Sequence, residues 1–165
     1  MKKTTLLSVL LLILATFVAT SCSDDETAKK LNGKWEVTSG IPTLGEEGMT
    51  MTFVFNSSDM TGSMDFDVKA EGMDMMSMSI PYTWECTSSD ITFKMEADKA
   101  TIKFSDAIKE MAKQSGESLE EAEKQAKAEL VKSMPNLGSN AITELTDTKL
   151  VMDADGSAIS CKRVK

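Results

Sequence analysis

The sequence predicts a mainly β protein: an eight-stranded antiparallel up-and-down barrel with a helical insertion before the last two strands. Three observations favour this class. Apolar and polar residues alternate along most of the chain after residue 33, as in strands that line a core on one side. The gaps between these runs are short and polar, so successive runs pair as antiparallel neighbours. From residue 105 to residue 134 the alternation is replaced by helical spacing.

The first six expected strands form a meander. They cover residues 34–38, 49–56, 64–69, 76–85, 91–96 and 100–104. Two more strands follow the helical insertion, at 141–152 and 157–164, and they flank Asp155-Gly156. Asp-Gly between two strand-like runs is a strong hairpin signal. Eight antiparallel strands can close on themselves, and closure removes the exposed sheet edges.

The insertion is expected to contain two helices. Apolar and small residues recur at helical spacing from Ile108 to Ser115 and again from Leu119 to Leu130. Ser118 and Glu121 have the spacing of a capping box, in which each side chain binds an exposed backbone amide of the other. Gly116 is expected to separate the helices and Pro135 to end the second one.

The first 21 residues have the composition of a secretory signal peptide. Lys2 and Lys3 precede an apolar run from Leu6 to Val18. These 13 residues are fewer than the roughly 20 that a helix needs to span a bilayer. A basic start, a short apolar run and small residues after it are typical of export signals. We therefore expect residues 1–21 to be absent from the mature protein.

Cys22 directly follows this segment. The junction resembles the bacterial lipobox, where cleavage leaves an acylated cysteine as the first residue, although Ala19 stands where leucine is usual. Ala19-Thr20-Ser21 also fits ordinary cleavage, which would give a soluble periplasmic protein. The next residues, Ser23 to Glu26, look like the acidic tag of surface-exposed lipoproteins in one Gram-negative phylum. We predict lipidation of Cys22, membrane attachment through that lipid, and display at the outer-membrane surface.

The mature chain is expected to comprise a flexible lipidated tether, residues 22–32, and one barrel domain, residues 33–165, with its insertion at 105–134. The whole chain has a net charge of −8, and removal of the signal with its two lysines gives about −10. Only one arginine is present, Arg163. A chain this acidic has no electrostatic footprint for nucleic acid, so nucleic-acid partners are not expected.

Gly33-Lys34-Trp35 resembles the G-x-W motif that opens the lipocalin barrel. The segment Ile142–Val151 with the Asp155-Gly156 turn is similar to the closing hairpin of bacterial lipocalin-like lipoproteins. The resemblance implies that Trp35 packs at the closed end beneath Arg163, a structural cation–π pair that contributes roughly 0.5–2 kcal/mol. It also implies a module that binds a small molecule. The insertion departs from the family, whose main helix follows the eighth strand.

The chain contains no histidine, which removes the commonest general base and the commonest transition-metal ligand. No phosphate-binding glycine loop is present. The carboxylates fall mainly at outward or turn positions, although paired carboxylates could in principle serve a glycosidase. We predict a protein that is not an enzyme and has no catalytic residue, metal or cofactor.

Thirteen methionines are unusual. Thioethers suit Cu(I), and Met73 and Met75 are the candidate ligands because they fall off the apolar register. Met64, Met76 and Met78 fall on that register and are expected to fill the core or to line it adaptably around an apolar ligand. The candidate inward ligand contacts are Phe53, Met64, Phe66, Met76, Met78 and Trp84.

Cys86 and Cys161 form an even pair in an exported chain, which permits a disulfide. We favour two separate buried thiols. The functional expectation is a lipid-anchored, lipocalin-like module that holds a small apolar or amphipathic ligand. The alternative is a structural protein with a solid barrel that binds a partner protein through residues 105–134; the sequence does not identify that partner.

Overall fold

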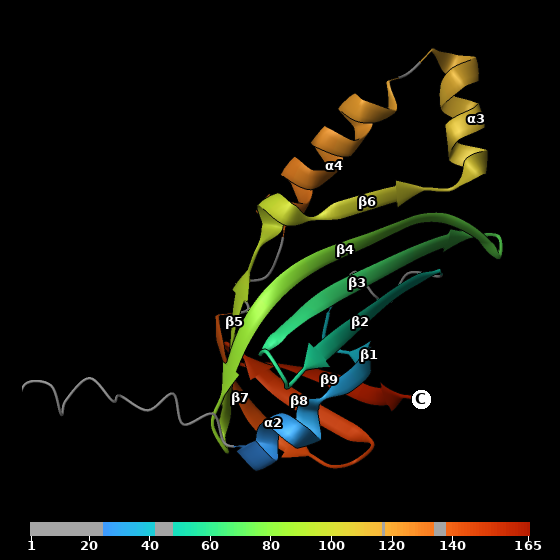
Figure 1. Cartoon of the computed structure of the whole chain (residues 1–165). Coiled ribbons are helices and arrows are strands. Elements are labelled where there is room, and N and C mark those ends of the chain that lie inside the picture. Colours follow the sequence, from blue (N-terminus) through green and yellow to red (C-terminus); the bar gives the residue numbers. More distant parts are fainter. Residues whose placement is uncertain (1–24, 42–47, 117, 134–137) are drawn as a thin grey trace, which may run out of the picture.

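The computed structural model describes residues 25–41, 48–116, 118–133 and 138–165. Eight antiparallel strands close into a barrel, and two helices project from one end of it (Figure 1). The strands are β1 (Gly33–Ser39), β2 (Met49–Asn56), β3 (Thr61–Ala70), β4 (Met73–Cys86), β5 (Asp90–Met95), β6 (Thr101–Phe104), β7 (Ser139–Leu145), β8 (Lys149–Ala154) and β9 (Ser157–Val164). The helices are α2 (Asp25–Leu31), α3 (Asp106–Ser115) and α4 (Leu119–Ser133), with a short 3-10 turn η2 (Ala97–Lys99).

The ring runs β1-β2-β3-β4-β5-β7-β8-β9 and returns to β1. Every strand of the ring therefore pairs with its neighbours along the chain, and β9 closes the ring by placing Arg163 opposite Trp35 and Cys161 opposite Val37. The predicted eight-stranded up-and-down barrel with a helical segment before the last strands is confirmed.

The sixth predicted strand has a different position from the one expected. β6 does not continue the meander beside β5; it pairs with β4, through Met76 opposite Phe104 and Met78 opposite Ile102. β5 pairs with the later part of the same strand, from Tyr82 to Cys86. β5 and β6 thus lie in line along one edge of β4, which at 14 residues is long enough for both. The turn η2 joins them.

The run from Ala141 to Met152, expected to be one strand, is a hairpin of β7 and β8. Thr146 makes the turn, because its Oγ1 accepts hydrogen bonds from the backbone amides of Thr148, at 3.3 Å, and Lys149, at 2.9 Å. Three strands therefore follow the helices, where two were predicted. The second hairpin forms as expected at Asp155-Gly156, and the Gly156 amide donates to Asp153 Oδ1 at 2.7 Å.

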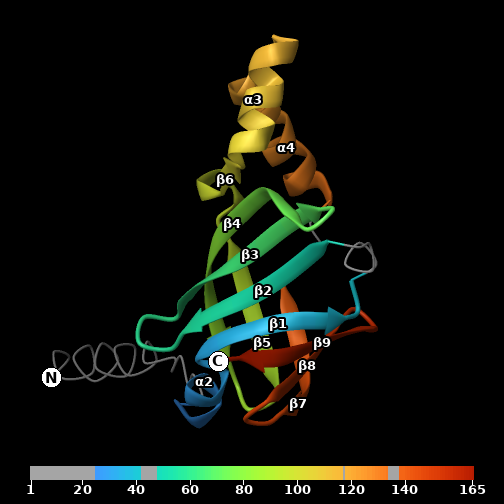
Figure 2. The same ribbon diagram turned by 90° about the vertical axis from the view of Figure 1, so that its right-hand side faces the viewer.

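Residues 25–31, inside the stretch expected to be a flexible tether, form α2. The helix covers one end of the barrel (Figure 2), and three of its side chains are buried: Thr27, Ala28 and Leu31. These positions lie on one face of a helix, so α2 has a small apolar face that packs on the barrel. The tether prediction is wrong for residues 25–31.

The core fills the half of the barrel nearest α2. Its largest fully buried side chains are Trp35, Trp84, Tyr82, Phe53, Phe55, Leu31, Met51, Met64, Ile80, Ile91, Leu150 and Met152. Leu31 comes from α2, and the others come from every strand of the ring except β7 and β9, which contribute the buried residues Asn140, Ile159 and Cys161. Alternating inward positions supply this core, as the period-two pattern predicted.

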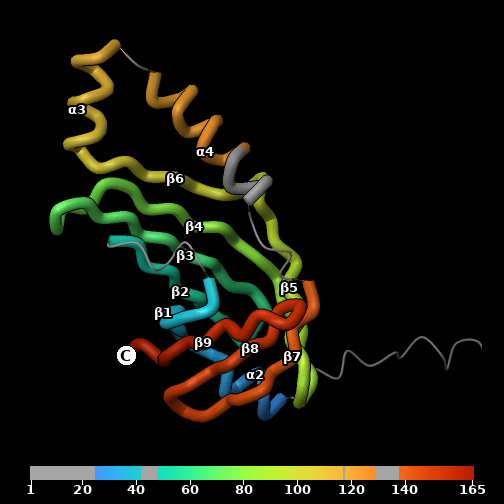
Figure 3. Tube along the Cα trace, turned by 180° about the vertical axis from the view of Figure 1, so that it is seen from behind, coloured from blue at the N-terminus to red at the C-terminus, as the bar shows by residue number. Residues whose placement is uncertain are grey.

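The helices α3 and α4 stand beyond β6, at the end of the molecule opposite α2 (Figures 1 and 3). Ser105 caps α3 by accepting a hydrogen bond from the Ile108 amide at 3.3 Å. Gly116 ends α3 in the left-handed conformation, with φ of 74°. Ser118 Oγ accepts from the Glu121 amide at 3.3 Å, which is one half of the predicted capping box.

Candidate functional site

The closed end of the barrel is built around Arg163. Its guanidinium lies over the indole of Trp35, 4.2 Å from the ring centroid, which is the contact that the sequence resemblance implies. Its three nitrogens donate to backbone carbonyls: Nε to Asp147 at 2.6 Å, Nη1 to Asn32 at 2.6 Å, and Nη2 to Lys30. One planar side chain therefore joins α2, the β7–β8 turn and the first strand.

Trp35 and Gly33 complete this end. The indole Nε1 of Trp35 donates to the carbonyl of Leu31 at 2.6 Å, so the last carbonyls of α2 are satisfied by side chains of β1 and β9. Gly33 has φ of 117°, and a Cβ there would lie 2.9 Å from Arg163 Nη1. Glycine is required by both its conformation and the closeness of the guanidinium. These contacts give this end of the barrel a structural role.

The next layer is an aromatic cluster. Phe55 contacts Trp84 edge to face with ring centroids 5.2 Å apart, and Tyr82 contacts Phe93 in the same way at 5.2 Å. The polar atoms are satisfied by backbone: Tyr82 Oη donates to Val54 at 2.9 Å and Trp84 Nε1 donates to Thr61 at 2.9 Å. Such edge-to-face contacts stabilise a packed interior.

Three of the six predicted ligand contacts belong to this filled part of the barrel. Phe53 and Met64 are 0% exposed and Trp84 is 2% exposed. They pack against other core side chains, with Phe53 5.7 Å from Phe93 between ring centroids. The structure therefore assigns these three residues to the core.

The other three predicted contacts, Phe66, Met76 and Met78, lie towards the open end. Phe66 stands opposite Met78 in the β3–β4 ladder, and both are half-buried at the border of the core. Met76 lies one inward position further along β4 and is also half-buried. The inner face of the sheet thus continues beyond the packed core as a partly open apolar surface.

The register across β2, β3, β4 and β6 shows the extent of this surface, which we call the apolar rim. It has two rows, and their half-buried members are Met49, Phe66, Val68, Met76, Met78 and Phe104. Sequence reasoning missed Met49, Val68 and Phe104 as members. They occupy inward positions of the alternation, but only the register shows that they share one face with Met76.

A polar groove of about 480 Å³ lies at the open end, on the outer face of the strands that carry the apolar rim. Its lining consists of Thr50, Asp67, Lys69, Asp74, Met76, Ser77, Lys103, Phe104 and Ser105. Lys69 Nζ and Asp74 Oδ1 form an exposed ion pair at 3.1 Å. Thr50, Asp67, Ser77 and Lys103 stand opposite one another across four strands. These four residues alternate with the rim residues along their strands, so they lie on the outer face of the sheet while the apolar rim lies on its inner face.

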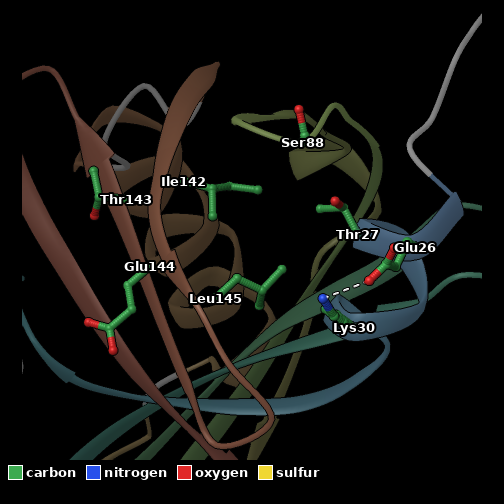
Figure 4. Close-up of a pocket in the computed structure, with 8 residues that line it drawn as sticks. All are labelled: Glu26, Thr27, Lys30, Ser88, Ile142, Thr143, Glu144 and Leu145. Atoms are coloured by element: carbon green, nitrogen blue, oxygen red, sulfur yellow. Dashed lines mark ion pairs between the residues drawn. The ribbon is translucent and has the colours of Figure 1, made fainter.

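A second pocket, of about 350 Å³, lies between α2 and β7 at the closed end (Figure 4). Ile142 and Leu145 point from β7 towards Glu26, Thr27 and Lys30 of α2. Residues three apart in a regular strand face opposite sides. The irregularity between Ile142 and Glu144 puts both apolar side chains on one side. Ser88, Thr143 and Glu144 complete the lining.

The remaining predicted residues are placed as follows. Cys86 and Cys161 are buried and are not joined by a disulfide, and burial raises the pKa of Cys161 to about 12. Met73 is exposed on the β3–β4 hairpin and Met75 is half-buried. Within the described residues, no group of three or more Cys, Asp or Glu side chains is arranged to hold a metal ion. Cys22 and residues 1–21 lie outside the described residues.

No helix within the described ranges is long and apolar enough to cross a membrane. The chain matches no protein-family model and no curated protein. Among solved structures, it is similar to an uncharacterized protein from Bacteroides eggerthii, with 14% sequence identity and a TM-score of 0.42. That similarity covers 81% of this chain and 99% of the other.

Proposed function

We propose that this chain is an exported, lipid-anchored, lipocalin-like module without catalytic activity that holds a small apolar or amphipathic ligand at the open end of its barrel. One observation carries the proposal: the apolar rim continues the inner face of the barrel beyond the packed core. Half-buried apolar side chains that gather on one surface leave apolar area in contact with water, and covering that area is favourable.

The composition of the rim favours an apolar or amphipathic ligand. Its side chains are aliphatic, aromatic and thioether groups from four strands, whereas Asp67 and Lys103 line the polar groove on the outer face of the same strands. An amphipathic ligand would cover the rim with its apolar body and keep its polar end in water at the open end of the barrel. Methionine side chains are flexible and polarizable, so they adapt to ligands of varied shape. Few polar contacts around a mainly apolar surface are typical of small-molecule sites.

The lipid anchor rests on Cys22, which directly follows the apolar run and the small residues of the expected export signal and precedes the acidic stretch from Ser23 to Glu26. Two or three acyl chains hold a protein firmly at a membrane, whereas one gives marginal binding. Mass spectrometry of the mature N-terminus tests this part. An acylated Cys22 supports the proposal, and an unmodified N-terminus at Cys22 contradicts it.

The ligand proposal is tested with a fluorescent apolar probe. Met76→Glu introduces a charge at the half-buried rim, so we expect probe affinity to fall by about tenfold or more, in line with the cost of placing a charge beside an apolar ligand. Thr83→Glu is the matched control, because Thr83 is exposed on the outer face of the same strand. Equal loss in both variants, or no probe binding by the unmodified chain, would contradict the site.

A separate observation supports a second candidate function, the binding of a partner protein. The helices α3 and α4 project from the barrel, and Met111 of α3 is 53% exposed. This arm could bind a partner protein while the barrel stays solid. Replacing residues 106–133 with a short Gly-Ser linker should then abolish partner capture and leave the barrel folded. Capture by the shortened chain would refute this alternative.

A further inference from the structure

The closed end is connected directly to the candidate anchor. α2 begins at Asp25, three residues after Cys22. It is fixed to the barrel by buried Ala28 and Leu31 and by side-chain donors from Trp35 and Arg163 to its last carbonyls. A helix held in this way moves with the barrel as one body.

The length of chain between the lipid anchor and α2 limits how far the closed end can lie from the membrane. Three peptide units from Cys22 to Asp25 span at most about 11 Å even when fully extended. This span is close to the Debye length at physiological salt, about 8 Å, which is the range over which exposed charges interact. From this geometry, and resting on the lipid anchor proposed above, we propose that the closed end lies against the membrane surface. The domain is then held in one orientation, with the apolar rim and the α3–α4 arm directed away from the lipid.

The charged side chains of α2 balance one another. α2 has two acids and two lysines, and they pair within the helix: Lys29 with Asp25 at 2.9 Å and Lys30 with Glu26 at 2.9 Å. The helix therefore has no net charge, although the whole chain has −8. The turns around α2 also carry Asp59, Asp90 and Asp147. It is therefore α2 itself that presents no net charge to anionic headgroups, which repel an acidic protein.

The end of the molecule opposite α2 is the end that faces away from the membrane in this orientation. The β3–β4 hairpin, β6 and the two long helices lie far from α2 in every view (Figures 1, 2 and 3). The polar groove lies at the same end, with Lys69 and Asp74 of that hairpin in its lining. In this orientation the binding surface faces outward, where a ligand reaches it without passing between the barrel and the bilayer.

The experiment uses the full lipidated chain in phosphatidylcholine–phosphatidylglycerol vesicles that contain a headgroup-labelled acceptor dye. Donor dyes are placed at Thr148→Cys, on the exposed β7–β8 turn beside Arg163, or at Gln114→Cys, on α3. The unsubstituted chain measures background labelling, because Cys86 and Cys161 are buried. Energy transfer to the membrane should be severalfold more efficient from position 148 than from position 114.

A second protein carries a Gly-Ser linker of about 20 residues, with a mean span of roughly 25 Å, inserted before Asp25. Its two transfer efficiencies should converge, because the barrel is then free to turn. Equal transfer from both positions in the short-tether protein, with an acylated Cys22 seen by mass spectrometry, overturns the orientation and leaves the anchor standing. A mass spectrum without acyl chains overturns both.

Discussion

Arg163 is only partly buried, yet we expect its replacement to lower the stability of the fold strongly. Arg163→Ala removes the cation–π contact with Trp35, which contributes roughly 0.5–2 kcal/mol. It also removes donors to the carbonyls of Lys30, Asn32 and Asp147. A hydrogen bond to a charged group contributes roughly 1.5–3 kcal/mol when well formed. The guanidinium is half-exposed and water can replace part of this, so we expect a total loss of about 2–4 kcal/mol.

The assay is chemical and thermal unfolding of the mature chain carrying Cys22→Ser, which removes the lipid. For a domain of this size, the expected loss corresponds to a fall in the melting temperature of roughly 8–15 °C. Hydrogen exchange should also show the amides of α2 losing protection, because its last carbonyls lose their partners. Arg163→Lys should be intermediate, since a lysine keeps the charge but cannot reach three carbonyls at once.

Lys162→Ala is the matched control. Lys162 neighbours Arg163 in β9 and forms an exposed ion pair with Glu36 at 3.0 Å, and exposed pairs contribute at most about 1 kcal/mol. The reasoning is refuted if Arg163→Ala destabilises the protein no more than Lys162→Ala does. It is also refuted if α2 keeps its protection in Arg163→Ala.

Three further predictions concern stability in urea. Gly33→Ala should cost about 1–3 kcal/mol, because the strained φ and the approach to Arg163 both oppose a Cβ; a neutral effect would contradict this. Phe53→Ala should cost about 3–5 kcal/mol as a core truncation, and a smaller loss would indicate a loosely filled barrel. Burial raises the pKa of both Tyr82 and Cys161. The folded state therefore holds these protons more tightly than the unfolded state. Their contribution to the free energy of unfolding should be fully present below about pH 9 and should be lost as the pH rises towards 12. A flat urea midpoint from pH 8 to 11 would be inconsistent with these shifts.

The barrel was predictable because its period-two pattern is strong and its turns are short. Phe53 and Trp84 were correctly placed on the inward face, since alternation alone fixes the side of a strand that a residue occupies. The same pattern could not separate the packed core from the open rim. That division depends on where each strand extends beyond its neighbours, and only the register shows that Met76 lies past the core while Phe53 lies within it.

Two elements escaped prediction for identifiable reasons. The β7–β8 turn contains no glycine or proline, and its geometry comes from the Thr146 hydroxyl; Thr-Asp-Thr within the run was the available signal. α2 has seven residues, too few for a stable isolated helix in water. It forms because Leu31 is buried on the barrel and Arg163 binds its carbonyls, and both contacts come from tertiary structure.

The most direct test of the proposed function is native mass spectrometry of the full chain extracted from the membranes of a Gram-negative host. The account predicts a mature protein that begins with acylated Cys22 and retains a small molecule, and it predicts that Met76→Glu loses that molecule while Thr83→Glu keeps it. A chain that carries no small molecule would contradict the account, and so would one that retains it equally in both variants.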